Sequence, residues 1–155
     1  MRYDSRPNDD GGRSRWCQIP GMQDPKNLAV SRHALELAVS VYRLTEHFPS
    51  HERFGLTSQM RRAAVSIGCN IWEGCGRWGN RELVQYLQMS YSSASELAFQ
   101  LTLEKELEFG NADARDEAAE RTDHVQRMLN RLMVAKRARP TAARGRPTTR
   151  TAREA

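Results

Sequence analysis

Residues 83–101 read LVQYLQMSYSSASELAFQL, and they carry the strongest periodic pattern in the chain. Its leucines and small residues are separated by 4, 3, 4, 3 and 4 positions: Leu83, Leu87, Ser90, Ala94, Leu97 and Leu101. This spacing places all six on one face of an α-helix, as in the a/d seam of packed helices, over nearly three heptads. The stretch therefore predicts a long helix over about 81–109 that buries one face against other helices.

Three further segments have helical periodicity, at about 27–48, 57–76 and 113–137. In the first, the residues expected to face the core are Leu28, Leu35, Ala38, Val41, Tyr42 and Phe48. Pro49, the glycines of 74–79 and the Gly110–Asn111 pair separate the helices by short connections. Four amphipathic helices with short connections predict an all-α, up-down-up-down antiparallel four-helix bundle over residues 27–137.

Composition limits the class of protein. The 155 residues suffice for one domain with tails. No run approaches about 20 apolar residues, so we expect no membrane span, and the N-terminal sequence lacks the apolar region of a secretory signal. The three cysteines, at positions 17, 69 and 75, are odd in number and lack zinc-ligand spacing. These features favour a reduced, cytoplasmic protein.

The net charge of +5 is concentrated in the C-terminal segment. Residues 1–26 hold five basic and four acidic side chains, residues 27–137 hold fourteen of each, and residues 138–155 hold five arginines and one glutamate. Both terminal segments, 1–26 and 138–155, are predicted to be disordered tails. An Arg-rich tail can bind phosphate backbones, or it can simply keep the protein soluble.

The predicted topology gives the bundle two ends of opposite charge. One end gathers both tails, the 76–80 connection and the end of the last helix, and the other gathers the acidic residues of 104–120. The basic residues expected to bind nucleic acid are Arg77, Arg81, Arg131, Lys136, Arg137, Arg139, Arg144 and Arg146. The alternative is that acids at the start of the last helix and bases at its end only complement the helix dipole.

The helix at 57–76 has two apolar faces. One holds Met60, Ala63, Ala64, Ile67, Ile71 and Gly74 and is expected to face the core. The nearly opposite face holds Val65, Gly68, Cys69 and Trp72. A bundle helix needs only one apolar stripe, so the second face predicts contact with another subunit and hence a homo-oligomer. The alternative is that the first helix or a tail covers this face within the same chain.

A polar row lies between these two faces and consists of Arg62, Ser66, Asn70, Glu73 and Arg77. Glu73 precedes Arg77 by four positions, which favours an ion pair on a helix. A half-buried row of this kind needs hydrogen-bond partners and often fixes the register of packing. We therefore interpret Arg62, Asn70 and Glu73 as structural residues.

Catalytic and metal sites have little support in the sequence. A di-metal site in a four-helix bundle needs Glu-x-x-His on two helices, and none of the predicted helices carries it. The four histidines are scattered, and neither Cys69 nor Cys75 has an adjacent helical base. We expect a non-enzymatic protein without cofactor or metal, with a di-metal enzyme as a remote alternative.

Two stretches carry a family resemblance: RFGLTSQMRRAAVSIGCNIWEGCGR (53–77) and ELVQYLQMSYSSASELAFQL (82–101). Over about residues 27–135 the chain resembles the bacterial four-helix-bundle proteins encoded in intervening sequences of 23S rRNA genes. It is also similar to the accessory variability determinant of diversity-generating retroelements. The residues that match the family pattern are Arg61, Arg62, Asn70, Glu73, Gly74 and Arg77.

The resemblance implies a ring-like homopentamer with a basic surface that engages nucleic acid. The leading hypothesis is thus a homo-oligomeric bundle that binds structured RNA, or less favourably DNA. The alternative is a protein-interaction scaffold, such as an accessory factor of a reverse transcriptase. The chain departs from the pattern at Gly68–Cys69, where the family has Pro-Ser, and at Trp72, where it has a small residue.

Overall fold

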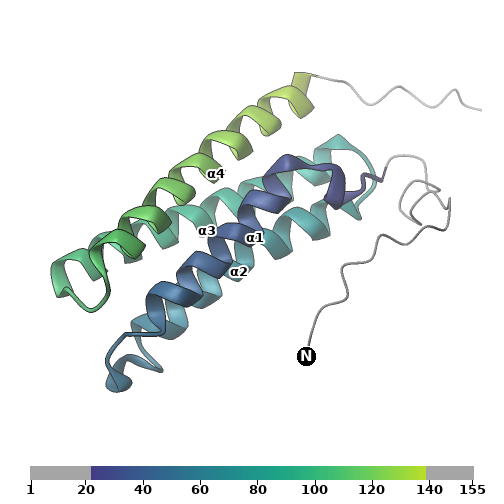
Figure 1. The fold of residues 1–155 in the computed structure, drawn as a ribbon. Helices are drawn as coiled ribbons and strands as arrows, with labels where there is room; N and C mark the ends of the chain where they lie inside the picture. The colour runs from purple at the N-terminus through teal and green to yellow at the C-terminus, as the bar shows by residue number, and fades with distance from the viewer. Residues whose placement is uncertain (1–21, 139–155) are drawn as a thin grey trace, which may run out of the picture.

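The computed structural model describes residues 22–138, and these form an antiparallel four-helix bundle (Figure 1). The elements are the 3₁₀ turn η2 (Pro25–Asn27), α1 (Ala29–Thr45), the 3₁₀ turn η3 (Ser50–Glu52), α2 (Leu56–Cys75), α3 (Asn80–Leu107) and α4 (Ala112–Ala138). No strand occurs in this part of the chain. The predicted all-α, up-down-up-down architecture is confirmed. The tails predicted at the two ends fall largely outside the described residues.

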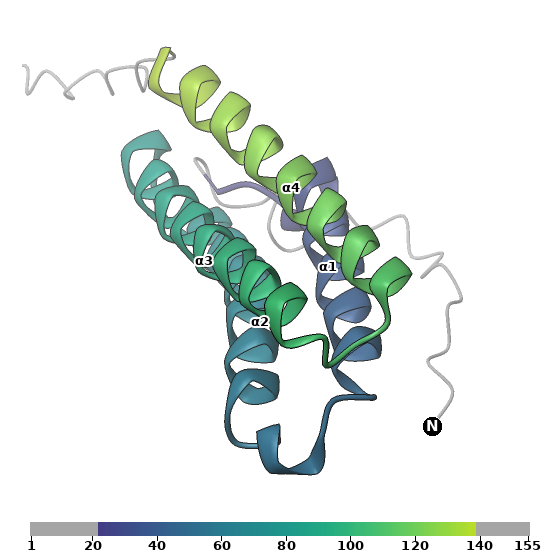
Figure 2. The same ribbon diagram turned by 90° about the vertical axis from the view of Figure 1, so that its left-hand side faces the viewer.

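Neighbours in the chain are neighbours in space. α1 packs on α2 and α4, and α3 packs on the same two helices. In the view of Figure 2, α3 lies in front of α2 and α4 lies in front of α1. This order is the one that short connections impose on antiparallel helices.

The seam of α3 is buried as its spacing predicts. Leu87, Ala94 and Leu97 have no exposed surface, and Leu83 and Leu101 are only 3% exposed. The predicted core face of α2 is buried as well, and α4 contributes Ala118, Val125 and Leu129. Burial of these apolar side chains is the main contribution to the stability of the bundle.

The core face of α1 differs from the prediction. Leu35 and Tyr42 were expected inside, but they are 66% and 46% exposed. The buried stripe is instead Val30, Ala34, Leu37, Val41 and Leu44. Both stripes follow helical spacing, because α1 carries apolar residues on two of its faces as α2 does. The prediction selected the wrong stripe in part.

α2 and α3 approach each other closely through small residues. A Cβ added to Gly74 would lie 2.7 Å from Cβ of Tyr86 and 3.1 Å from Cδ1 of Leu83. The buried hydroxyl of Ser90 donates a hydrogen bond of 2.9 Å to the carbonyl of Ile67. Glycine and serine therefore hold these two backbones nearer together than larger residues would allow.

Gly68 and Gly74 lie on the same helix and provide a matched pair for substitution. Gly74→Ala should destabilise the protein by about 1–3 kcal/mol, because the new methyl group overlaps Tyr86. No atom lies within 4 Å of a Cβ on Gly68, so Gly68→Ala should stabilise a subunit by about 0.5–1 kcal/mol through helix propensity. Urea unfolding monitored by circular dichroism would measure both, and equal signs for the two substitutions would contradict this packing.

The corner between α3 and α4 is built around a buried carboxylate. Glu104 has no exposed surface, although it was expected to lie on the acidic end of the bundle. Its Oε1 accepts a hydrogen bond of 2.8 Å from the Gly110 backbone N–H, and its Oε2 lies 3.8 Å from Nε of Arg115. Arg115 is itself largely buried, with 13% of its side chain exposed. One side chain thus fixes both the connection and the first turn of α4.

Candidate subunit and nucleic-acid interfaces

The second apolar face of α2 borders a groove. Val65 and Trp72 are 41% and 44% exposed, Cys69 is also exposed, and Gly68 is half-buried. All four predicted interface residues lie on this groove, which has a volume of about 620 Å³ and a mostly apolar lining. The groove lies between α1 and α2.

α1 forms the other wall of the groove and does not cover it. Leu35 and Ala38 line it opposite α2, and Val39 and Tyr42 continue the apolar surface toward the end of α1. The alternative in which the first helix covers the second face of α2 is therefore wrong. Sequence reasoning missed these α1 residues, although two apolar stripes on α1 were the available indication.

The polar row of α2 faces α3. Nη2 of Arg62 lies 3.2 Å from Oε1 of Glu96, and the hydroxyls of Ser66 and Ser93 are 3.0 Å apart. The amide of Asn70 donates to the carbonyl and hydroxyl oxygens of Ser66 on its own helix. Through Arg62 and Ser66 the row thus connects α2 to α3, and its role in fixing the register of packing stays a prediction.

Glu73 is the centre of a three-residue cluster. It accepts hydrogen bonds from the guanidinium of Arg77 and, at 2.9 Å, from the Tyr86 hydroxyl. The guanidinium also lies over the Tyr86 ring, 5.0 Å from its centroid. The hydrogen bonds from Arg77 and Tyr86 lower the pKa of Glu73, and the bond to Glu73 raises the pKa of Tyr86. Arg77 thus faces a carboxylate, which reduces its capacity to bind phosphate.

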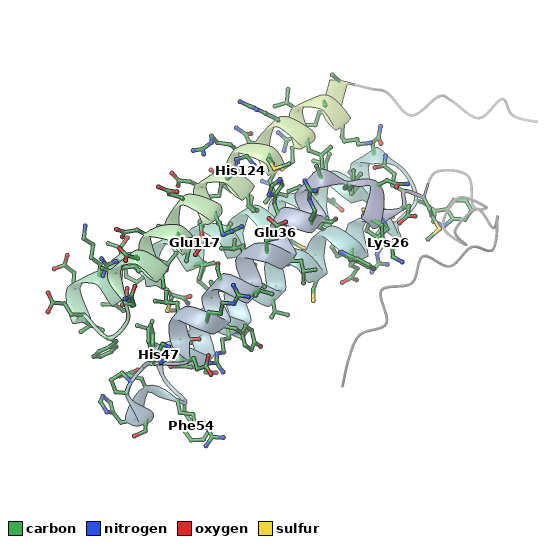
Figure 3. All side chains as sticks on the ribbon, in the orientation of Figure 1. Lys26, Glu36, His47, Phe54, Glu117 and His124 are labelled. Atoms are coloured by element: carbon green, nitrogen blue, oxygen red, sulfur yellow. The ribbon has the colours of Figure 1, made fainter. Side chains whose placement is uncertain are left out.

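The basic end of the bundle gathers η2, the α2–α3 connection and the end of α4 (Figure 1). The Gln23 N–H donates a hydrogen bond of 3.1 Å to the Cys75 carbonyl and joins two of these segments. Together the ranges 22–27, 73–82 and 131–138 hold six basic and three acidic residues. Figure 3 shows Lys26 at this end, with His47 and Phe54 at the other.

Exposed cations at the basic end come from two helices. Arg81 lies in the first turn of α3, and Arg131 and Arg137 lie near the end of α4. Within residues 22–138, no carboxylate lies within ion-pair distance of these three side chains. Lys136 is half-buried, and its positive charge partly offsets the rise in the pKa of the Cys75 thiol that burial causes. The predicted Arg139, Arg144 and Arg146 lie outside the described residues.

The opposite, acidic end holds eight acidic and three basic residues in the ranges 46–55 and 104–117. Among these acids, Glu104 is buried, and its carboxylate forms an ion pair with Arg115. The remaining acids give this end a negative potential that disfavours a polyanion. The two ends of the bundle therefore differ in the ligands they can attract.

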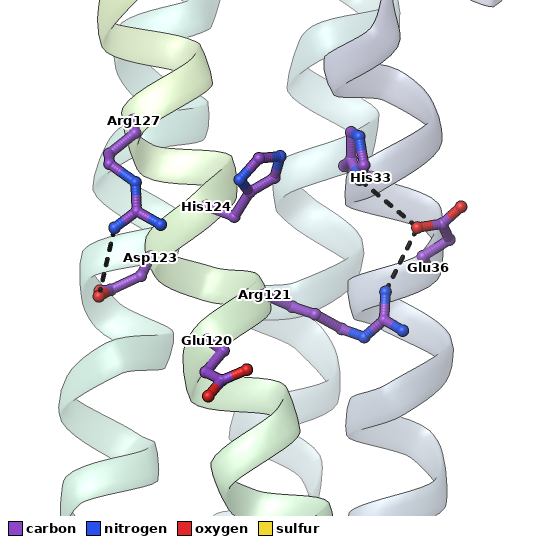
Figure 4. A pocket seen from close by; sticks show the side chains of 7 residues that line it. All are labelled: His33, Glu36, Glu120, Arg121, Asp123, His124 and Arg127. Atoms are coloured by element: carbon purple, nitrogen blue, oxygen red, sulfur yellow. Dashed lines mark hydrogen bonds and ion pairs between the residues drawn. The ribbon is translucent and has the colours of Figure 1, made fainter.

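A polar pocket of about 450 Å³ lies between α1 and α4 (Figure 4). The rings of His33 and His124 meet edge to face with centroids 4.7 Å apart. Oε2 of Glu36 lies 3.4 Å from Nδ1 of His33 and 3.3 Å from Nη1 of Arg121. The fold thus brings together two histidines that are scattered in the sequence. Across the described part of the chain, no three His, Cys, Asp or Glu side chains converge as metal ligands.

Comparisons with known proteins identify the family. A search of curated proteins gave no match. Residues 26–131 match the family model described as 23S rRNA-intervening sequence protein. A solved structure from Bacteroides thetaiotaomicron, described as a protein with unknown function from the S23 ribosomal protein family, is 21% identical with a TM-score of 0.63. The match covers 68% of this chain and 98% of that one, and it shows a common fold.

Among the helices of residues 22–138, none is long and apolar enough to cross a membrane. The family match extends over more than half of the chain and includes α1, α2, α3 and most of α4. The chain therefore belongs to the 23S rRNA-intervening sequence protein family.

Proposed function

We propose that the protein is a non-enzymatic homo-oligomer that binds structured nucleic acid, RNA in preference to DNA, through its basic end and C-terminal segment. The observation that carries this proposal is the group of exposed arginines, Arg81, Arg131 and Arg137, which two helices bring to one end. The Arg-rich segment 138–155 continues from the same end. Arginines without carboxylate partners can bind phosphate in the bidentate geometry that favours this residue.

Assembly through the groove strengthens this function. In a cyclic oligomer whose axis runs along the bundles, all basic ends lie on one side of the ring. Several basic ends that contact one nucleic acid bind it with greater avidity than a single end does. The family resemblance suggests five subunits, and the family description, with its reference to 23S rRNA, supports RNA as the ligand.

The second candidate is a scaffold whose main ligand is a protein, such as a reverse transcriptase. The groove favours this candidate, since an apolar surface with Trp72 and Leu35 exposed can be buried by a protein but not by a phosphate backbone. A scaffold of this kind would bind nucleic acid weakly and with little dependence on the basic end. The same experiment therefore separates the two functions.

The test is the salt dependence of binding to a structured RNA, measured by fluorescence anisotropy. Each phosphate contact contributes about 0.7–0.9 to the slope of log affinity against log salt concentration. Arg131→Ala/Arg137→Ala should therefore reduce that slope by about 2, and deletion of residues 138–155 should reduce it further. The control is Arg53→Ala, which alters an exposed arginine at the acidic end and should leave the slope unchanged. Absent or salt-insensitive binding would rule out the nucleic-acid function.

A further inference from the structure

The groove opens beside the point where the chain enters the described structure. Lys26 and Trp72 line the groove at its end nearest the basic end of the bundle. The hydrogen bond from the Gln23 N–H to the Cys75 carbonyl holds the entering chain against the last residue of α2. Whatever precedes Gln23 therefore starts close to the mouth of the groove.

The segment that precedes Gln23 is apolar. Residues 16–22 read WCQIPGM and contain no charged side chain, whereas the first fifteen residues contain seven. Trp16 and Ile19 are large apolar residues in this segment, which precedes the four helices in the chain. An apolar segment next to an apolar groove can remove both surfaces from water.

Chain length permits this contact. Cys17 precedes Gln23 by six residues, which can extend over about 20 Å. Along α2, Cys69 lies six residues before Cys75 and Val65 lies ten before it, or about 9 Å and 15 Å by helical rise. Residues 16–21 can therefore reach most of the groove without any change in the bundle.

We propose that residues 16–21 bind in the groove of their own subunit as a strap, and that a neighbouring subunit displaces this strap on assembly. The first part is independent of the proposed function, and only the displacement depends on the groove being the subunit interface. A short tether gives the strap an effective concentration on the order of millimolar, so the strap competes with a dilute partner. Gly68 suits this role because it leaves open space where any other residue would place a side chain.

The native cysteines provide a direct test of the strap. Cys69 is exposed on the groove, and Cys17 belongs to the strap. Cys75 is buried, and burial raises the pKa of its thiol to about 11, so it stays protonated and unreactive near neutral pH. Diamide accepts two electrons and two protons as the sulfur atoms of Cys17 and Cys69 form one bond. Non-reducing gels and peptide mass mapping then distinguish a disulfide within a chain from one between chains.

The control variant is Trp16→Ser/Ile19→Ser, which keeps the tether and Cys17 but removes the apolar side chains. In the unchanged protein at nanomolar concentration, we expect a Cys17–Cys69 disulfide within one chain, formed about tenfold faster than in the control. Equal rates in the two proteins, or disulfides mainly between chains, would overturn the strap.

Displacement is tested separately by the concentration at which subunits assemble. Deletion of residues 1–21 should lower that concentration about tenfold in light scattering, since the competitor is lost. An unchanged concentration would overturn displacement. A protein that forms the disulfide but never assembles would refute the subunit interface and leave the strap in place, so the two failures are distinguishable.

Discussion

Trp72→Glu should convert the proposed homo-oligomer into folded single subunits. Trp72 borders the groove and is 44% exposed in the subunit, so its side chain contributes little to the core. A carboxylate at this position would have to be desolvated whenever another subunit covers the groove. In a closed ring the same charge occurs at every interface, which multiplies the effect. The fraction assembled should therefore fall from nearly complete to nearly zero at micromolar concentration.

The measurement is light scattering of the purified protein, with circular dichroism to verify that the helices remain. Trp78→Glu is a matched control, because Trp78 is 59% exposed in the α2–α3 connection and does not line the groove. The Trp78 variant should assemble like the unchanged protein. A wild-type protein that is monomeric, or a Trp72→Glu variant that still assembles, would contradict the interface.

Glu104→Ala should destabilise the fold more than any surface change. It removes the acceptor for the Gly110 N–H and takes away the buried carboxylate beside the largely buried Arg115, which keeps only the exposed carboxylate of Asp116 as an ion-pair partner. Loss of one member of a buried charged pair typically destabilises a protein by about 3–5 kcal/mol. For a domain of this size, such a change is a large part of the whole free energy of unfolding.

Two further variants locate the origin of this effect. Glu104→Gln keeps an acceptor for Gly110 and removes only the charge, so it should destabilise less than Glu104→Ala. Glu106→Ala changes an exposed acid on the same helix and should alter the free energy of unfolding by less than about 0.5 kcal/mol. Urea unfolding gives all three values. Equal effects of Glu104→Ala and Glu106→Ala would mean that the corner does not depend on the carboxylate.

Periodicity in the sequence is sufficient to predict α2, α3 and the bundle topology. The seam from Leu83 to Leu101 marks a single face of α3, so the pattern leaves one choice for the face that is buried. α1 and α2 each have two apolar faces, but the larger aliphatic residues of α2, Met60, Ile67 and Ile71, share one of them. α1 carries large apolar residues on both faces, and a helical wheel cannot show which of them meets α2 and α4. Leu35 and Tyr42 were assigned to the core for this reason, although they are exposed. An excess of apolar residues on a bundle helix indicates a second surface, but not which residues belong to it.

Contacts between distant positions are the features that the sequence does not reveal. His33 and His124 are ninety-one positions apart, and only the packing of α1 on α4 brings their rings together. Glu104 could have been recognised, because it follows Leu101 by three positions and continues the buried seam of α3. Its partners Gly110 and Arg115 lie in the α3–α4 connection and in the first turn of α4, and sequence periodicity does not describe the geometry of that connection.

The opposite charges at the two ends give the protein an electric dipole along its length. Near a polyanion, this dipole experiences a torque that turns the basic end forward before any contact forms. Encounters then begin in an orientation that already presents Arg81, Arg131 and Arg137, so fewer collisions are unproductive. The acidic end points away from the polyanion and repels a second strand. The charge separation thus makes the molecule one-sided, so that the proposed nucleic-acid ligand would meet only one end of it.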